Sequence, residues 1–245
     1  MKVKDEEIEK LMYCSPKHGF FFLAIPKVAT TSLITWMLRM EGIPFNEQTY
    51  INGLIRKRLM LRNHGLDPLA IFSFTFVRNP WIRLASAYLD KFVKDRKTPH
   101  IMAIRITEAM GRKKTGITFR EFVENHVAKT DLNQCDVHWR IQYHMVQYAQ
   151  PKFIGRFEKI QKDFDFVMEK IGTTQELDHL NKSQTSVIKP TPALSEVPAL
   201  KLRQMRRVSW QSIYTPDLVE QVGSLYAEDI KAYDYQSPFN TGSSR

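Results

Sequence analysis

The fold of this chain is decided by residues 19–33, which read GFFFLAIPKVATTSL. Within them, Phe20 to Ile25 form an uninterrupted apolar run, which is typical of a strand covered on both faces in a parallel sheet. Pro26 cannot donate a hydrogen bond to a neighbouring strand, so the strand ends there. Apolar residues then recur at helical spacing over 33–41, and Gly42 supplies a stop. The stretch therefore predicts a buried strand, a tight turn and a helix.

The turn between this strand and this helix carries groups that suit an anion. Lys27 brings a mobile positive charge, and Thr30, Thr31 and Ser32 are residue types that cap helices. A helix N-terminus adds unpaired backbone N–H groups and the positive end of the helix dipole. The turn lacks the Gly-x-x-x-x-Gly-Lys-Ser/Thr spacing of the Walker loop, so an ordinary nucleoside triphosphatase is not indicated. It predicts a phosphate- or sulfate-binding turn, against the alternative of a structural turn with an incidental lysine.

The same plan recurs some fifty residues later. Residues 71–77 predict a second strand, with three phenylalanines on one face by the period of two. This strand ends at Arg78, after which Asn79 is a good N-cap and Pro80 a good first residue for a helix. Two such units in one parallel sheet bring both turns to the same sheet edge, where open α/β folds bind ligands. The sequence therefore predicts that the two basic turns meet.

Composition limits the classes of protein that remain. The chain has 245 residues, enough for a full core, and a formal net charge of +10, which favours anionic partners such as nucleic acid, acidic glycans or a polyphosphorylated nucleotide. Its two cysteines, Cys14 and Cys135, are too few for a disulfide framework or a zinc cluster and predict free thiols. The charged N-terminus does not read as a signal peptide, and no run approaches the ~18 apolar residues of a membrane span.

Residues 26–33 resemble the 5′-phosphosulfate-binding loop of sulfotransferases that use 3′-phosphoadenosine 5′-phosphosulfate (PAPS). Residues 76–92 closely resemble the 3′-phosphate-binding segment of the same family, in which the arginine that ends the strand and a serine in the following helix hold the phosphate. An arginine fork suits phosphate geometry, and a hydroxyl adds a donor. One departure is Asn79, where the family usually has Asp. The residues that the resemblance assigns to PAPS in these two segments are Lys27, Val28, Ala29, Thr30, Thr31, Ser32, Arg78 and Ser86.

Weaker segments extend the resemblance to about residues 19–235, and the nearest members are the Golgi carbohydrate sulfotransferases that modify chondroitin, dermatan and related glycans. Residues 136–142 resemble the His-Trp-x-Pro-Gln segment of the chondroitin 4-sulfotransferase group, although Ile141 replaces the proline. Residues 155–158 fit the Gly-x-Phe-Glu element of the family. The loop at 179–183 resembles one that approaches the nucleotide, which assigns Lys182 and Ser183 to PAPS.

The resemblance implies an α/β fold of three layers, in which helices flank a parallel sheet, of the P-loop-NTPase-like sulfotransferase type. We expect a single sulfotransferase domain over 1–245. Within it, residues 1–18 are expected to form an N-terminal arm, 184–205 a lid or loop, and 240–245 a disordered tail.

The implied reaction moves a sulfuryl group from PAPS to a hydroxyl of an acceptor, most plausibly a carbohydrate, and needs no metal. Lys27 is expected to neutralise the charge that grows on the leaving phosphate. The general base is expected to be His138, which Asp136 is placed to orient. The alternative is that His138 has only a structural role beside Trp139. Other candidates for the base are His179, Glu158 and His64.

Two other functions compete with sulfuryl transfer. A small-molecule kinase with a non-standard phosphate loop needs an Asp-rich magnesium site, which the sequence does not contain. A nucleic-acid-binding module would scatter its cations rather than end two strands at basic turns, so no nucleic-acid partner is expected. Loops 42–62 and 95–118 are expected to select the acceptor. Because the chain shows no membrane anchor where the Golgi relatives carry one, the sequence predicts a cytoplasmic protein or a truncated catalytic domain.

Overall fold

A computed structural model describes residues 5–46, 57–94, 101–111, 116–177, 194–205 and 207–239. The chain forms two compact units. The sheet unit comprises Met1–Arg78 and Gln142–Ser183, and the helical unit comprises Asn79–Ile141 and Gln184–Arg245. That residues 1–245 act as a single sulfotransferase domain stays a prediction. The expected tail at 240–245 lies outside the described residues.

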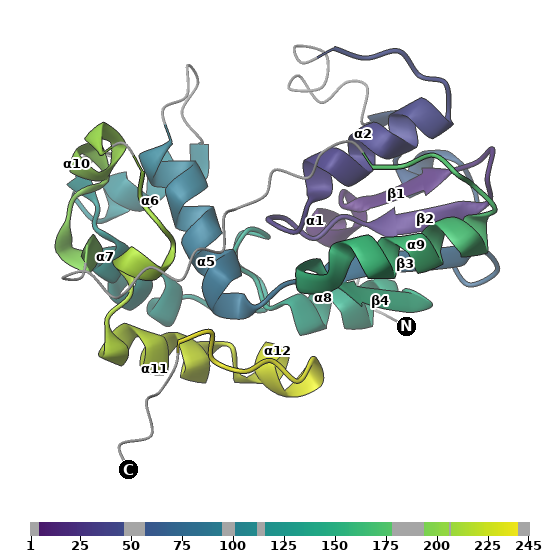
Figure 1. The fold of residues 1–245 in the computed structure, drawn as a ribbon. Coiled ribbons are helices and arrows are strands. Elements are labelled where there is room, and N and C mark those ends of the chain that lie inside the picture. The colour runs from purple at the N-terminus through teal and green to yellow at the C-terminus, as the bar shows by residue number, and fades with distance from the viewer. Residues whose placement is uncertain are drawn as a thin grey trace. The chain divides into compact units, whose positions relative to one another are not determined.

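The sheet unit is built on a four-stranded sheet in the order β1-β2-β3-β4 (Figure 1). Its strands are β1 (Met12–Ser15), β2 (Phe20–Leu23), β3 (Phe72–Val77) and β4 (Phe153–Arg156). The three later strands run parallel, as the apolar runs predicted, whereas β1 pairs antiparallel with β2. Only four residues join β1 to β2, and so short a connection allows only an antiparallel pair. The α/β class is therefore confirmed, and the sheet is mixed rather than wholly parallel.

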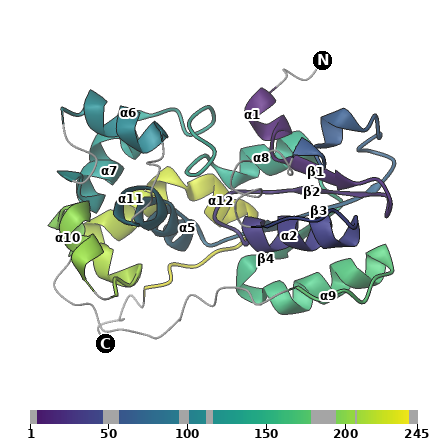
Figure 2. The same ribbon diagram turned by 90° about the horizontal axis from the view of Figure 1, so that it is seen from above.

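The helices of this unit cover both faces of the sheet. Figure 2 shows α2 (Thr30–Met40) and α9 (Ile160–Ile171) on one side of the strands, with α1 (Glu6–Glu9) and α8 (Gln142–Ala149) on the other. The three-layer arrangement expected from the sequence is thus present. The expected N-terminal arm at 1–18 is more ordered than an arm, because it contains both α1 and β1.

An aromatic core joins β2 and β3 to the helices α2 and α9. Phe22 stacks on Phe74 with ring centroids 5.0 Å apart, and Phe20 packs on Trp36 at 5.8 Å. Trp36 meets the edge of Phe164 at 4.9 Å, which ties α2 to α9. These five side chains are fully buried. Aromatic pairs in such tilted and edge-to-face arrangements stabilise a core beyond the area they bury, so the layers that carry the two basic turns are held firmly together.

Strand β4 carries a glycine, Gly155, opposite Phe76 of β3. A Cβ atom on Gly155 would lie 2.5 Å from the ring of Phe76, its neighbour in the parallel register. Any larger residue would therefore displace a buried aromatic side chain. This contact gives a physical reason for the glycine that opens the Gly-x-Phe-Glu element.

The helical unit contains, in the described part of the chain, α-helices joined by short 3₁₀ turns. Helix α5 continues after Tyr88 as one turn of π-helix, and Tyr226 separates the two helices α11 and α12. Residues 199–204, inside the stretch expected to be a lid or loop, form helix α10. The α-helices are α5 (Pro80–Tyr88), α6 (Ile101–Ala109), α7 (Phe119–Asn125), α10 (Ala199–Gln204), α11 (Pro216–Leu225) and α12 (Ala227–Ala232).

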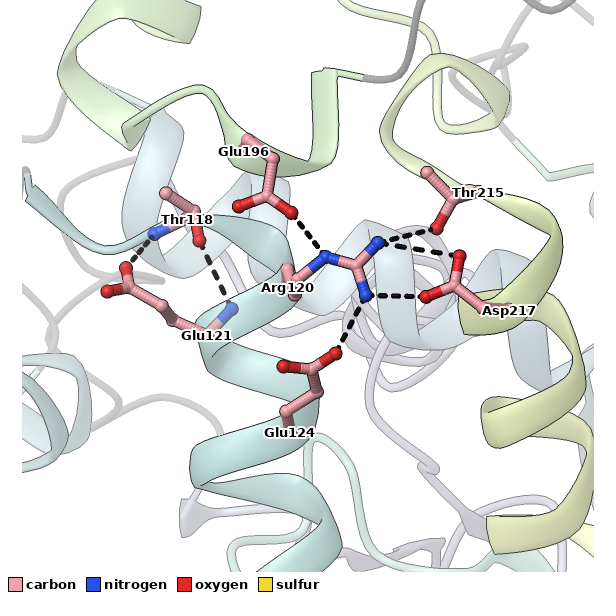
Figure 3. Close-up of polar contacts among 7 residues, drawn as sticks. All are labelled: Thr118, Arg120, Glu121, Glu124, Glu196, Thr215 and Asp217. Carbon is pink, nitrogen blue, oxygen red and sulfur yellow. Dashed lines mark hydrogen bonds and ion pairs between the residues drawn. The ribbon is translucent and has the colours of Figure 1, made fainter.

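One arginine links three segments of the helical unit through ion pairs. Helix α7 opens with a capping box between Thr118 and Glu121, as their spacing predicts. In the same turn, Arg120 donates to Glu124 on its own helix, to Glu196 on a 3₁₀ turn and to Asp217 on α11 (Figure 3). The hydrogen bonds that Arg120 donates hold the pKa of the Asp217 carboxyl well below its usual range. The residues drawn in Figure 3 are Thr118, Arg120, Glu121, Glu124, Glu196, Thr215 and Asp217.

Both cysteines are buried free thiols, as predicted. Burial raises the pKa of Cys14 in the sheet unit and of Cys135 in the helical unit to about 12. Each therefore stays protonated and behaves as a small apolar side chain.

Candidate functional site

The turn between β2 and α2 has a strained backbone that suits an anion. Lys27 and Ala29 both have positive φ, 71° and 50°, a conformation that costs energy for residues with a Cβ. Ala29 is the N-cap of α2 and is left-handed, whereas the helix that follows is right-handed. Adjacent residues of opposite hand turn their N–H groups toward one side and form a concavity for anions.

The hydroxyl residues of this turn do not act as the caps that the sequence predicted. Helix α2 already begins at Thr30, and no side chain caps its first turn. The Thr30 hydroxyl instead donates to the carbonyl oxygen of Ile25 at 2.7 Å, while Thr31 is exposed and Ser32 is half-buried. Ala29 takes the N-cap position instead, so the three hydroxyl residues lie within the first turn of the helix. No side chain therefore caps the N–H groups at this helix end, and N–H groups at a helix N-terminus can bind an anion.

Strand β3 delivers Arg78 to the same turn. Its Nη1 donates a hydrogen bond of 2.9 Å to the carbonyl oxygen of Lys27, and its guanidinium lies 4.3 Å from the centroid of the Phe157 ring. Arg78 is only 7% exposed. The expectation that the two basic turns meet at one sheet edge is therefore confirmed, because β2 and β3 are parallel neighbours and a direct contact joins the residues that follow them.

Two further residues of the segment that resembles the 3′-phosphate site stand at the start of helix α5 or within it. Ser86 lies on α5 in the helical unit and is half-buried. Asn79 stands at the N-cap position of α5 but makes no cap bond; its Nδ2 donates to the carbonyl oxygen of Gln236 at 3.0 Å. Lys182 and Ser183 lie outside the described residues.

The candidate base His138 belongs to the helical unit and is held by its predicted partner. Its Nδ1 lies 2.6 Å from Oδ1 of Asp136, and the same oxygen accepts the backbone N–H of His138 at 2.9 Å. The two side chains are 21% and 11% exposed, so the pair is shielded but reachable. A carboxylate on one ring nitrogen fixes the ring and leaves Nε2 as the atom that can take a proton.

Two arginines hold the segment that carries this pair. Arg83 of α5 is buried and donates to the carbonyl oxygens of Val137 and Arg140, both at 2.8 Å. Arg140 in turn donates through Nε to the carbonyl oxygen of Cys135 at 2.9 Å. Burial lowers the pKa of Arg83, and the buried carboxylate of Asp229 opposes this shift. The backbone around His138 is thus fixed by charged hydrogen bonds, which are stronger than neutral ones.

The other candidate bases are placed differently. His64 is exposed, and its Nε2 lies 2.5 Å from the carbonyl oxygen of Arg58. Glu158 is exposed and directly follows Phe157, the ring that stacks on Arg78. His179 lies outside the described residues. Within the sheet unit, Glu158 is therefore the candidate whose neighbour touches the paired turns.

Two residues at the site were not singled out from the sequence. Phe157 supports the guanidinium of Arg78, and Gln142 binds the backbone of Arg78 through its side-chain amide. Both stand in segments that resemble family elements, the Gly-x-Phe-Glu and the His-Trp-x-Pro-Gln segments. Neither segment showed from its residues alone which partner it would meet.

This chain belongs to the sulfotransferase family, since the model of that family, described as "Sulfotransferase family", matches residues 10–236. The match favours sulfuryl transfer over the kinase and nucleic-acid alternatives. No solved structure matches the chain significantly.

The curated relatives are named carbohydrate sulfotransferases. Carbohydrate sulfotransferase 14 of Danio rerio is 28% identical over 176 residues, 65% of this chain and 47% of the relative. Carbohydrate sulfotransferase 9 of Homo sapiens is 22% identical over 251 residues, 93% of this chain and 54% of the relative. Carbohydrate sulfotransferase 11 of Mus musculus is 25% identical over 185 residues, 64% and 51% respectively. The chain therefore spans about half the length of the relatives it matches.

These relatives overturn the cytoplasmic location predicted from the sequence. The prediction rested on a missing apolar segment, but the matching proteins are carbohydrate sulfotransferases, which are Golgi-resident and membrane-anchored. A chain that spans half of such proteins does not reveal an anchor or its lack. In the described part of the chain, no helix has both the length and the apolar character needed to cross a membrane.

Among the described residues, no group of three or more His, Cys, Asp or Glu side chains is placed to hold a metal ion. The expectation that the reaction needs no metal stays a prediction.

Proposed function

We propose that this chain is the catalytic part of a PAPS-dependent sulfotransferase that modifies a hydroxyl of a carbohydrate. The observation that carries the proposal is the hydrogen bond between Arg78 and the Lys27 carbonyl, which joins the two segments that resemble the 5′-phosphosulfate and 3′-phosphate sites. A sulfotransferase needs both sites on one nucleotide, and a kinase or a nucleic-acid-binding protein does not. The names of the relatives support a carbohydrate as the acceptor.

PAPS supplies the sulfuryl group: a bond forms between the acceptor oxygen and sulfur as the bond from sulfur to the phosphate oxygen breaks. The side chain of Lys27 and the N–H groups at the start of α2 neutralise the negative charge that grows on the phosphate side. Arg78 and Ser86 bind the 3′-phosphate, with Arg78 as the charged donor. Lys182 and Ser183 are proposed as further contacts to the nucleotide.

We assign the general base to His138. Asp136 holds Nδ1, so that Nε2 accepts the proton of the acceptor hydroxyl and the carboxylate stabilises the resulting imidazolium. The buried Arg83 and Arg140 keep this segment rigid. Glu158, His64 and His179 remain the alternative bases.

The proposal is tested in two stages. The first stage is a thermal-shift screen with adenosine 3′,5′-bisphosphate, ATP and short oligonucleotides. The bisphosphate should raise the melting temperature at a lower concentration than the other ligands, because a ligand that binds only the folded state stabilises it. PAPS carrying radioactive sulfur should then label desulfated chondroitin or dermatan. Stronger stabilisation by ATP or by oligonucleotides, with no label transferred to any glycan, would reject the function.

A further inference from the structure

The side chain of Gln142 makes a reciprocal pair of hydrogen bonds with the backbone of Arg78. Its Oε1 accepts the Arg78 N–H at 2.9 Å, and its Nε2 donates to the Arg78 carbonyl oxygen at 2.9 Å. Gln142 is 0% exposed and Arg78 only 7% exposed. Since neither backbone group can turn to water instead, the amide satisfies both of them.

The pair stands where the chain leaves and re-enters the sheet unit. The unit ends its first segment at Arg78 and resumes at Gln142, so these bonds join two points 64 residues apart. The register of β3 with β4 ends at Val77, and the amide of Gln142 binds the backbone of the next residue, Arg78. Gln142 itself opens helix α8, in which Met145, Val146 and Ala149 are also buried.

The position of Arg78 matters because of the contacts that its side chain makes. Its guanidinium donates to the Lys27 carbonyl and stacks on Phe157. Both contacts depend on where the backbone of Arg78 lies, since a shift of about 1 Å weakens a hydrogen bond and an aligned stack alike.

We propose that Gln142 is a positioning residue for the 3′-phosphate site. Its amide holds Arg78 where the guanidinium reaches the phosphate turn, and it thereby sets the preference for a nucleotide that carries a 3′-phosphate. The inference rests on the proposed function, in which Arg78 binds that phosphate. It gives a role to the glutamine of the segment that resembles His-Trp-x-Pro-Gln.

The test compares the dissociation constants of adenosine 3′,5′-bisphosphate and 5′-AMP by titration calorimetry. Gln142→Met keeps the length of the side chain and removes both hydrogen bonds, whereas Gln142→Asn keeps the amide but shortens its reach. The matched control is Thr75→Val on β3, which removes a buried bond of 2.7 Å to the Leu23 carbonyl without touching Arg78. All three variants should melt at a lower temperature than the wild type.

Only the Gln142 variants should lose selectivity. Selectivity is the dissociation constant of 5′-AMP divided by that of adenosine 3′,5′-bisphosphate. We expect this ratio to fall about tenfold in Gln142→Met, which corresponds to one well-made hydrogen bond. It should fall less in Gln142→Asn and stay unchanged in Thr75→Val. If Gln142→Met does not fold, Gln142→Asn decides. A wild-type ratio retained in folded Gln142 variants overturns this inference alone, whereas a ratio near one in the wild type overturns the nucleotide assignment together with it.

Discussion

Replacing Arg78 by alanine is the sharpest test of the nucleotide site. The guanidinium is nearly buried, so its hydrogen bonds are little weakened by solvent, and a hydrogen bond to a charged group contributes about 1.5–3 kcal/mol. Loss of a charged pair with the 3′-phosphate should therefore cost about 2–3 kcal/mol of binding free energy. At about 1.4 kcal/mol for each factor of ten, the dissociation constant of adenosine 3′,5′-bisphosphate should rise about 30- to 150-fold.

The affinity for 5′-AMP should change far less, because that nucleotide lacks the phosphate that Arg78 is proposed to bind. Titration calorimetry at fixed ionic strength measures both constants, since salt screens the interaction. Arg39→Ala is the control, because it removes one positive charge from an exposed position on α2 of the same unit. Equal wild-type affinity for the two nucleotides, or equal losses in Arg78→Ala and Arg39→Ala, would refute the reasoning.

Three further predictions concern the remaining site residues and the stability of the helical unit. Lys27→Ala should lower kcat about 10²–10³-fold while weakening bisphosphate binding much less, and turnover near wild type would make Lys27 a plain turn residue. His138→Ala should abolish turnover with bisphosphate affinity intact, and Asp136→Asn should give a milder loss; retained turnover would pass the role to another base. Because the pKa of Asp217 is lowered by Arg120, the stability this pair contributes is present above about pH 4 and lost on further acidification. The pair is exposed, so it contributes about 1 kcal/mol or less to stability. The difference in melting temperature between wild type and Asp217→Asn should therefore shrink below that pH. A difference that stays constant down to pH 2 would exclude the ion pair.

The sequence by itself determined the plan of strand, basic turn and helix, because its signals are local. The apolar run before Pro26 and the run before Arg78 end at residues that stop a strand, and both strands are present where they were predicted. The capping box of Thr118 and Glu121 is likewise local and is present in the structure. Given two parallel strands, the meeting of the two turns followed from topology alone.

Only the tertiary structure decided which groups the site residues touch. The Arg78 guanidinium binds a carbonyl 51 residues away, its backbone binds an amide 64 residues away, and the Asn79 side chain turns to a carbonyl 157 residues away instead of capping its helix. Capping would need the side-chain oxygen of Asn79 to accept a backbone N–H, whereas the packing brings a distant carbonyl to its Nδ2. Buried polar groups take whichever partners the packing brings to them. Residue type and spacing carry no record of that packing. The contacts that Gln142 and Phe157 make with Arg78 therefore follow only from the packing of β3, β4 and α8.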